Sequence, residues 1–247
     1  MPSLQHLHLV ALAAGGHRFA LKMLPSSKLK YVYIFGCGIR FRLLRKIVVG
    51  QSLLGVAFRP DPAQIEEITG SDISVPDLLA SLTDSKLSLK KLTLFPMGIR
   101  LEYSSLLMFK NLEALEVPYA GVLDIPRDET DPKAIYALLA DQLPANLTHI
   151  SLRYLAYDIQ TKVIIGQLAL LKTRKMFSRL DMARFIFYNA VAFPSIAQVL
   201  SIGGPTGALD AGTIWDPLPN FVPKVQEEFG KLYKEAGIYM LVKQSDY

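Results

Sequence analysis

One six-residue template recurs seven times along the chain and constrains its fold more than any other feature. Each copy begins with Leu, carries Leu, Val or Ile fourth, and carries Leu, Ile, Val or Phe sixth, except that the last copy has Ala183 fourth. The copies are LQHLHL from Leu4, LKYVYI from Leu29, LLGVAF from Leu53, LKKLTL from Leu89, LEALEV from Leu112, LTHISL from Leu147 and LDMARF from Leu180. Subtracting successive starting positions gives intervals of 25, 24, 36, 23, 35 and 33 residues, each long enough for one strand and one helix.

The segments between the copies have the patterns of helices. DPKAIYALLADQL offers Asp131 as an N-cap and Pro132 at the first helical position, and its aliphatic residues recur at helical intervals. Similar spacing occurs in GIRFRLLRKIVV, SVPDLLASL and TKVIIGQLALLKTRKMF. Near the end, VPKVQEEFGKLYKEAG predicts a helix that stops at Gly237, and the alternation in IYMLVK predicts a last strand. Strand and helix therefore alternate, and the predicted class is α/β.

A single strand and helix cannot bury its own leucines, whereas stacked units form a continuous core. We therefore predict a curved solenoid with parallel strands on its concave face and helices on its convex face. Residues 1–190 are expected to form about seven repeats, and residues 191–247 a degenerate repeat and a C-terminal helix-strand cap. Within 191–218, Ile196, Val199 and Ile202 fit either a degenerate unit or a helix with a loop.

Several of these stretches also resemble a known family. FKNLEALEVPYA, LPANLTHISLR, the helix ending in LLKTRKMFSRL and the closing LYKEAGIYMLV are similar to the leucine-rich-repeat region of fungal F-box proteins and their relatives, over most of the chain. The resemblance implies repeats that recognise a protein partner and an F-box that docks on the adaptor of a cullin ligase, so that the partner is ubiquitinated. The first copy starts at Leu4 and the F-box itself is absent, so the adaptor is expected as a partner only if an F-box lies upstream.

The register of the template predicts which side chains can meet a partner. Positions one, four and six point into the core, so positions three, five and seven face the concave side. Large aromatic residues lie there beside small ones, and Tyr and Arg are common interface anchors. The predicted partner-binding residues are Tyr31, Tyr33, Phe35, Arg59, Lys91, Phe95, Glu116, His149, Ser151, Arg153 and Arg184. The alternative is that the aromatic residues are covered by their own loops or pack only on each other.

Charge and cysteine content favour an intracellular protein, in cytoplasm or nucleus, that binds neither nucleic acid nor membrane. Lys and Arg number 27 against 22 Asp and Glu, without a block of five like charges, so no nucleic-acid strip is indicated. No uncharged apolar stretch reaches about 18 residues, and the short apolar run near the N-terminus has no preceding Lys or Arg. Cys37 is the single cysteine. Asn146 to Thr148 matches the N-glycan acceptor, but the repeat accounts for the same residues.

Catalytic, metal and cofactor motifs are weak. His6 and His8 share one strand face, but only His17 is a nearby third ligand, so no metal site is predicted. Cys37 fits a packed thiol, and the glycines of FGCGIR and GGPTGALDAG lack phosphate-loop spacing. The sequence thus predicts a non-enzymatic protein-binding module without cofactor, with substrate recognition for a cullin-RING ligase as one role. The alternative is a free-standing scaffold or inhibitor, and a hydrolytic enzyme ranks third.

Overall fold

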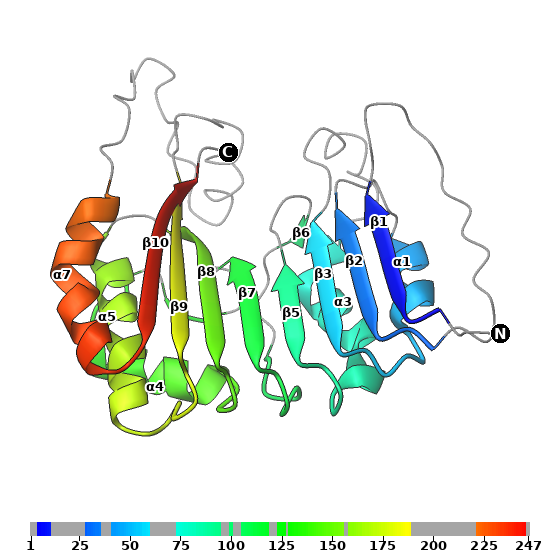
Figure 1. Ribbon diagram of the computed structural model, residues 1–247, viewed down its shortest axis with the longest axis horizontal. Coiled ribbons are helices and arrows are strands. Elements are labelled where there is room, and N and C mark those ends of the chain that lie inside the picture. Colours follow the sequence, from blue (N-terminus) through cyan, green and yellow to red (C-terminus); the bar gives the residue numbers. More distant parts are fainter. Residues whose placement is uncertain are drawn as a thin grey trace, which may run out of the picture.

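An all-parallel sheet of eight strands dominates the computed structural model (Figure 1). The structure describes residues 4–10, 28–35, 41–59, 73–94, 99–100, 105–118, 123–126, 128–155, 158–188 and 221–245. The strands are β1 (His6–Val10), β2 (Tyr31–Phe35), β3 (Gly55–Arg59), β5 (Lys91–Leu94), β7 (Ala114–Pro118), β8 (His149–Leu155), β9 (Met182–Tyr188) and β10 (Tyr239–Ser245). Each of the first seven of these strands begins at the third position of one of the seven predicted template copies.

The strands of this sheet lie side by side in chain order. The order is β1-β2-β3-β5-β7-β8-β9-β10, while β4 (Ile73–Ser74) and β6 (Ile99–Arg100) pair in a separate two-stranded sheet. A doubly wound sheet reverses its strand order at a switch point, and this sheet has no such reversal. The structure therefore confirms an α/β fold with a parallel sheet, and its strand order is compatible with leucine-rich repeats.

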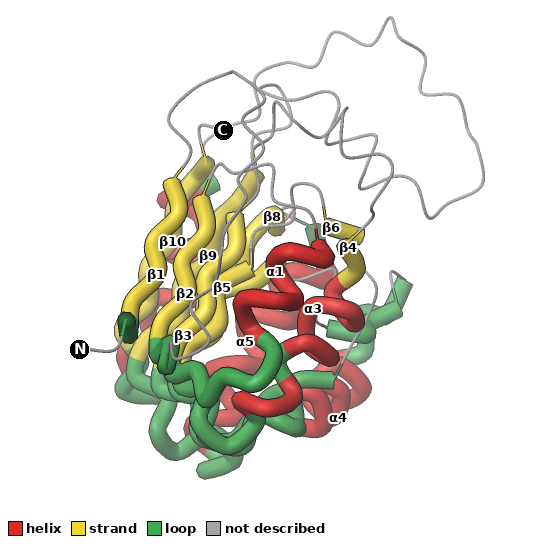
Figure 2. Tube along the Cα trace, turned by 90° about the vertical axis from the view of Figure 1, so that its right-hand side faces the viewer, coloured by secondary structure: helices red, strands yellow, loops and turns green. Residues whose placement is uncertain are grey.

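The described helices cover one face of the sheet, and the other face carries none (Figure 2). They are α1 (Phe41–Val48), α3 (Val75–Ser81), η2 (Thr83–Ser85), α4 (Pro132–Gln142), α5 (Ile159–Thr173) and α7 (Val222–Glu235). As the sequence predicts, the Asp131 side chain caps α4 by accepting hydrogen bonds from Lys133 N and Ala134 N. Figure 2 also shows that the two end strands lie farther from the helices than the middle strands do, so the helix-free face is bowed inward.

The register of the sheet follows the template residue by residue. Successive fourth positions are register partners across the sheet, as in Leu92 with Leu115. The sixth positions align in the same way except between β5 and β7, whose pairing ends at Thr93 and Glu116. The first-position leucines from the second copy onward are at most 2% exposed, whereas Leu4 of the first copy is 50% exposed. The three aliphatic positions of the template are thus the rows that join sheet and helices in one core.

Every copy is tied to the next by the same hydrogen bonds at the starts of the strands. The carbonyl of the second template position accepts two backbone N–H groups of the following copy, a pattern present six times from β1 to β9. Glu113 O, for example, accepts from Thr148 N at 2.8 Å and His149 N at 3.0 Å, and the Thr148 hydroxyl adds a third bond at 2.9 Å. This repetition shows that the copies are equivalent in their backbone geometry.

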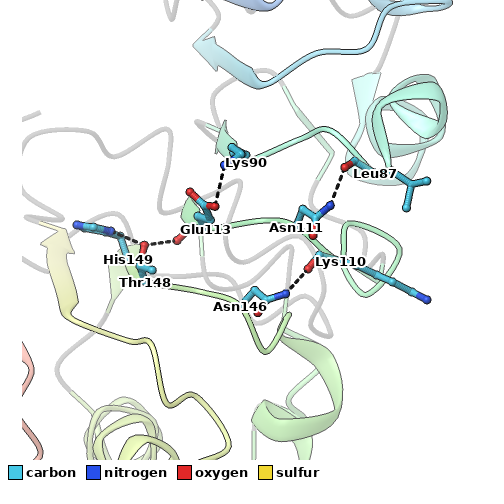
Figure 3. Close-up of polar contacts among 8 residues, drawn as sticks. All are labelled: Leu87, Lys90, Lys110, Asn111, Glu113, Asn146, Thr148 and His149. Atoms are coloured by element: carbon cyan, nitrogen blue, oxygen red, sulfur yellow. Dashed lines mark hydrogen bonds and ion pairs between the residues drawn. The ribbon is translucent and has the colours of Figure 1, made fainter.

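Side-chain amides reinforce these connections in the middle of the sheet (Figure 3). The residue before the first leucine is Asn111 in one copy and Asn146 in the next. Asn111 Nδ2 donates to Leu87 O, and Asn146 Nδ2 donates to Lys110 O, each at 2.7 Å. The two amides therefore occupy equivalent places, each bridging to the preceding copy.

The C-terminal segment forms the helix and the last strand that the sequence predicts. Helix α7 is followed by Gly237 at φ 67°, a left-handed conformation that glycine adopts without strain, and then by β10. The buried Tyr233 hydroxyl of α7 donates to Ile165 O of α5 at 2.7 Å, which holds the last helix against the one before it. The predicted degenerate unit at Ile196, Val199 and Ile202 lies outside the described residues.

Candidate functional site

The register places most of the predicted partner-binding residues on the helix-free face of the sheet, in the neighbourhoods that the template implies. Tyr31, Tyr33 and Phe35 of β2 are register partners of Gly55, Ala57 and Arg59 of β3. The third and fifth positions continue in line across the sheet; Gly55 and Ala57 pair with Lys91 and Thr93, and Thr93 pairs with Glu116. Phe95 lies outside the described residues. Two groups of interacting side chains stand out on this face.

The first group, the aromatic cluster, consists of His6, His8, Tyr31 and Tyr33. The His6 and Tyr31 rings stack with centroids 4.7 Å apart and planes 20° apart. His8 and Tyr33 are equally close at 4.7 Å, and the two tyrosine rings are nearly parallel at 6.2 Å and 11°. Both histidines are exposed and both tyrosines are half-buried. The cluster therefore presents an ordered set of rings to solvent across β1 and β2.

Gly55 of β3 leaves the space that the Tyr31 ring occupies. A Cβ built on Gly55 would stand 2.9 Å from Cδ1 of Tyr31 and 3.4 Å from the Tyr33 hydroxyl. Any larger residue would have to displace the Tyr31 ring, because real Cβ atoms do not come so close to another atom. The small residue beside the large one thus creates no recess here, since the Tyr31 ring fills the space.

Burial raises the pKa of the Tyr33 hydroxyl above its ordinary value of 10.0, and the nearby Tyr31 raises it further. Tyr33 is therefore a neutral phenol at physiological pH. A neutral ring with a hydroxyl combines apolar contact area with one hydrogen-bonding group. That combination suits a surface that meets a partner.

The second group, the charged cluster, consists of Glu116, Ser151, Arg153 and Arg184. Glu116 Oε1 accepts from Nε of Arg153 at 2.9 Å and also from a terminal nitrogen of the same guanidinium. Arg184 reaches the same oxygen at 3.8 Å. Ser151 lies between Glu116 and Arg184 in the register of the sheet. The structure thus brings together four predicted residues from three adjacent strands.

The remaining predicted residues belong to neither cluster. Lys91 is exposed on β5, and Phe35 is half-buried at the end of β2. Arg59 ends β3 opposite Phe35. The His149 Nδ1 atom lies 2.8 Å from the Thr148 hydroxyl, at the start of β8 (Figure 3).

At the fifth position of three template copies, the side chain is less exposed than expected. Ala57 and Thr93 are only 4% exposed and Ser151 is 8% exposed, although the template turns them away from the core. A short side chain stands close to the sheet and is shielded from water more easily than the rings and long charged chains around it. The template therefore predicted correctly to which face of the sheet these side chains point. Their exposed fraction also depends on the size of the neighbouring side chains.

His6 and His8 are the residues of the aromatic cluster that the interface prediction omitted. They occupy the third and fifth positions of the first copy, the same positions that Tyr31 and Tyr33 occupy in the second. The register alone was sufficient to find them.

Comparisons with protein-family models, with curated proteins and with solved structures found no match. The geometry of the two clusters therefore carries the functional argument.

Among the described residues, no three His, Cys, Asp or Glu side chains gather in a way that could hold a metal ion. His17 and Cys37 lie outside those residues. Across the same part of the chain, none of the helices combines the length and the apolar character needed to cross a bilayer.

Proposed function

We propose that this chain is a leucine-rich-repeat solenoid that binds a partner protein on its concave, helix-free face. Support for the architecture comes from the sequential parallel strands, the alignment of the seven template copies, and the hydrogen bonds that recur between copies. In such solenoids each repeat contacts only its neighbours, and the stack creates an extended concave surface. The resemblance to the repeat region of F-box proteins points to the same use.

The observation that carries this proposal is the chemistry of the helix-free face. Ordered aromatic rings lie at one end of it and arginines lie toward the other, and both are side chains enriched at interface hot spots. They stand on hydrogen-bonded strands, so little conformational entropy is lost when a partner binds. A protein-binding role also requires no catalytic group or cofactor. We place this role inside the cell, consistent with a chain that contains a single cysteine.

Mutation of the aromatic cluster tests the proposal. Partners are first selected from displayed protein fragments and random peptides with the full chain as bait, and their affinities are then measured. Changing Tyr31 and Tyr33 together to alanine should weaken binding by about tenfold or more, because truncation of hot-spot rings has effects of that size. Lys231→Ala on α7 is the control, since that side chain is 87% exposed on the helical side. Equal affinities of both variants and the wild type would refute the concave-face interface, provided that circular dichroism shows folded protein.

The role within the cell divides into two candidates that one binding experiment separates. The family resemblance suggests that the bound partner is a substrate of a cullin-RING ubiquitin ligase. The alternative is a free-standing scaffold or inhibitor. Binding of purified cullin-ligase adaptor by the full chain would support the ligase role. Retention of a selected partner by a chain that does not bind the adaptor would support the scaffold.

A further inference from the structure

The charged cluster carries more positive than negative charge. Arg153 and Arg184 both approach one oxygen of Glu116, so a single carboxylate faces two guanidinium groups. The side chains of Arg153 and Glu116 are each 20% exposed, and that of Arg184 is 34% exposed. Charges that are partly shielded from water interact more strongly than charges in bulk solvent. Glu116 is already bonded to Arg153, so the 3.8 Å contact offsets the charge of Arg184 only in part, in a setting that favours an added anion.

Two buried polar atoms in this cluster have no hydrogen-bonding partner. They are Nε of Arg184 and Oγ of Ser151. The Ser151 residue is only 8% exposed, so water does not readily satisfy its hydroxyl. Unsatisfied buried groups are rare in folded proteins because each one costs free energy, and a missing ligand is one physical explanation for them.

The register places these atoms side by side. Ser151 of β8 is the direct partner of Arg184 of β9 and of Glu116 of β7. Partner residues of parallel strands point to the same face and lie about 4.8 Å apart. Both Nε–H and the hydroxyl can donate a hydrogen bond, and a carboxylate has two oxygens that accept. One carboxylate can therefore satisfy both groups and offset the charge of Arg184.

We propose that the charged cluster is a subsite for an acidic side chain, Asp or Glu, of the protein partner. This inference rests on the proposed function and specifies the chemistry of the partner at one place on the concave face. The Arg184 side chain is one third exposed, so a change of its rotamer opens Nε and the Ser151 hydroxyl to the incoming carboxylate. A basic side chain is repelled by the charge of Arg184, and a neutral amide does not offset that charge.

The test uses the displayed fragments and random peptides already selected with the full chain. Sequences retained by the wild type should be enriched in Asp and Glu. A retained peptide and its Glu→Gln version are then titrated against the wild type and against Arg184→Gln. The wild type should bind the Glu peptide about tenfold more tightly, the effect expected of one charge-assisted hydrogen bond. The preference should fall to less than about twofold in Arg184→Gln.

Two further variants separate recognition from general effects of charge or folding. Arg179→Gln makes the same charge change at an exposed residue just before β9, outside the cluster, and should keep the preference for Glu. Ser151→Ala removes a hydroxyl that has no partner and should reduce the preference without unfolding the chain. In nuclear magnetic resonance spectra, the Arg184 Nε–H signal should shift with the Glu peptide and stay in place with the Gln peptide.

The failures of the two proposals are distinguishable. If binding is lost in the Tyr31 and Tyr33 double variant but shows no preference for acidic residues, the subsite is wrong and the concave-face function stands. The same conclusion follows if Arg184→Gln preserves the preference. If no selected sequence responds to changes on the helix-free face, the proposed function fails and the subsite fails with it.

Discussion

The aromatic cluster occupies third and fifth template positions and the charged cluster fifth and seventh positions, and the two are held by different forces. In β1 and β2, rings stack on each other over a glycine, and little charge is involved. In β7 to β9, a carboxylate joins two arginines, and two polar atoms remain unsatisfied. The aliphatic rows continue beneath both, although Leu7 and Leu9 of β1 are only partly buried. The repeat therefore determines where a side chain is displayed, and the displayed residue determines what the surface can bind.

The largest effect is expected at Gly55, because the Tyr31 ring occupies the space that a side chain at this position would need. Gly55→Val should lower the free energy of unfolding by about 1 to 3 kcal/mol, because its Cβ would meet the Tyr31 ring at 2.9 Å. Denaturant unfolding measures the change. The loss should disappear when Tyr31→Ala is combined with Gly55→Val, since the space is then empty.

Gly230→Ala in α7 is the matched control for this change. A Cβ at Gly230 has no atom within 4 Å. Alanine there should raise stability by about 0.5 to 1 kcal/mol through its helix propensity. A Gly55→Val variant as stable as the wild type would show that the rings do not need the glycine.

The charged cluster should depend on its ion pair more than the exposed pair of a neighbouring repeat does. Glu116→Gln should lower stability by about 1 to 2 kcal/mol, because it removes the carboxylate that faces two partly shielded guanidinium groups. Glu113→Gln makes the same change where the Lys90 and Glu113 side chains are 54% and 36% exposed, and should cost less than about 0.5 kcal/mol. Chemical denaturation by urea at low and high salt distinguishes them, since the difference should shrink as ions screen the charges. Equal losses would contradict the special role of the cluster.

Two buried serines should respond in opposite directions. The Ser85 hydroxyl donates to Gln51 O and accepts from Leu53 N, so Ser85→Ala should lower stability by about 1 to 2 kcal/mol. The Ser151 hydroxyl has no partner, and Ser151→Ala should raise stability by up to about 1 kcal/mol. Thermal unfolding of both variants measures the contrast. A destabilised Ser151→Ala protein would mean that the hydroxyl is already satisfied in the absence of a partner.

The smallest effect concerns alkaline pH. The pKa of Tyr33 is higher in the folded protein than its ordinary value of 10.0, so the unfolded chain releases this proton first. Stability should therefore be unaffected below pH 10 and fall as the pH rises above it, by at most about 1.4 kcal/mol per unit for one group. Tyr33→Phe should make that fall shallower.

Unfolding at several pH values above 10 tests this expectation, with Tyr239→Phe as the control for the loss of an exposed hydroxyl. The buried Tyr233 has its pKa raised well above 10.0 and adds to the same alkaline loss, so some of the fall should persist in Tyr33→Phe. An unchanged pH dependence would contradict the burial of the Tyr33 hydroxyl.

The parallel strands, their registers and the helices between them were predictable because they depend on patterns that repeat. Three aliphatic positions define the rows of the core, and one recurring spacing aligns them from Leu7 to Ala183. The side of the sheet reached by Tyr31 or Arg184 follows from the same spacing. These are consequences of strand geometry, which one sequence is sufficient to reveal.

The contacts between side chains were not predictable in the same way. Whether Arg153 meets Glu116 depends on rotamers and on the distance between strands that start 35 residues apart in the chain, from Leu112 to Leu147. His149 shows the limit, because the template turns it to the open face while its ring nitrogen approaches the Thr148 hydroxyl. Such choices depend on the chemistry of neighbours from other repeats, which the periodic pattern does not encode.

The amide of Asn146 has a consequence for how the protein is produced. Its Nδ2 atom donates to Lys110 O, and the same nitrogen is the one to which an N-glycan is attached at an Asn-x-Thr acceptor. A sugar added while the chain is still emerging in a secretory pathway would prevent this bond between neighbouring repeats from forming. Recombinant protein made in bacterial cytoplasm would keep the bond, and the route of expression would therefore decide which molecule is purified.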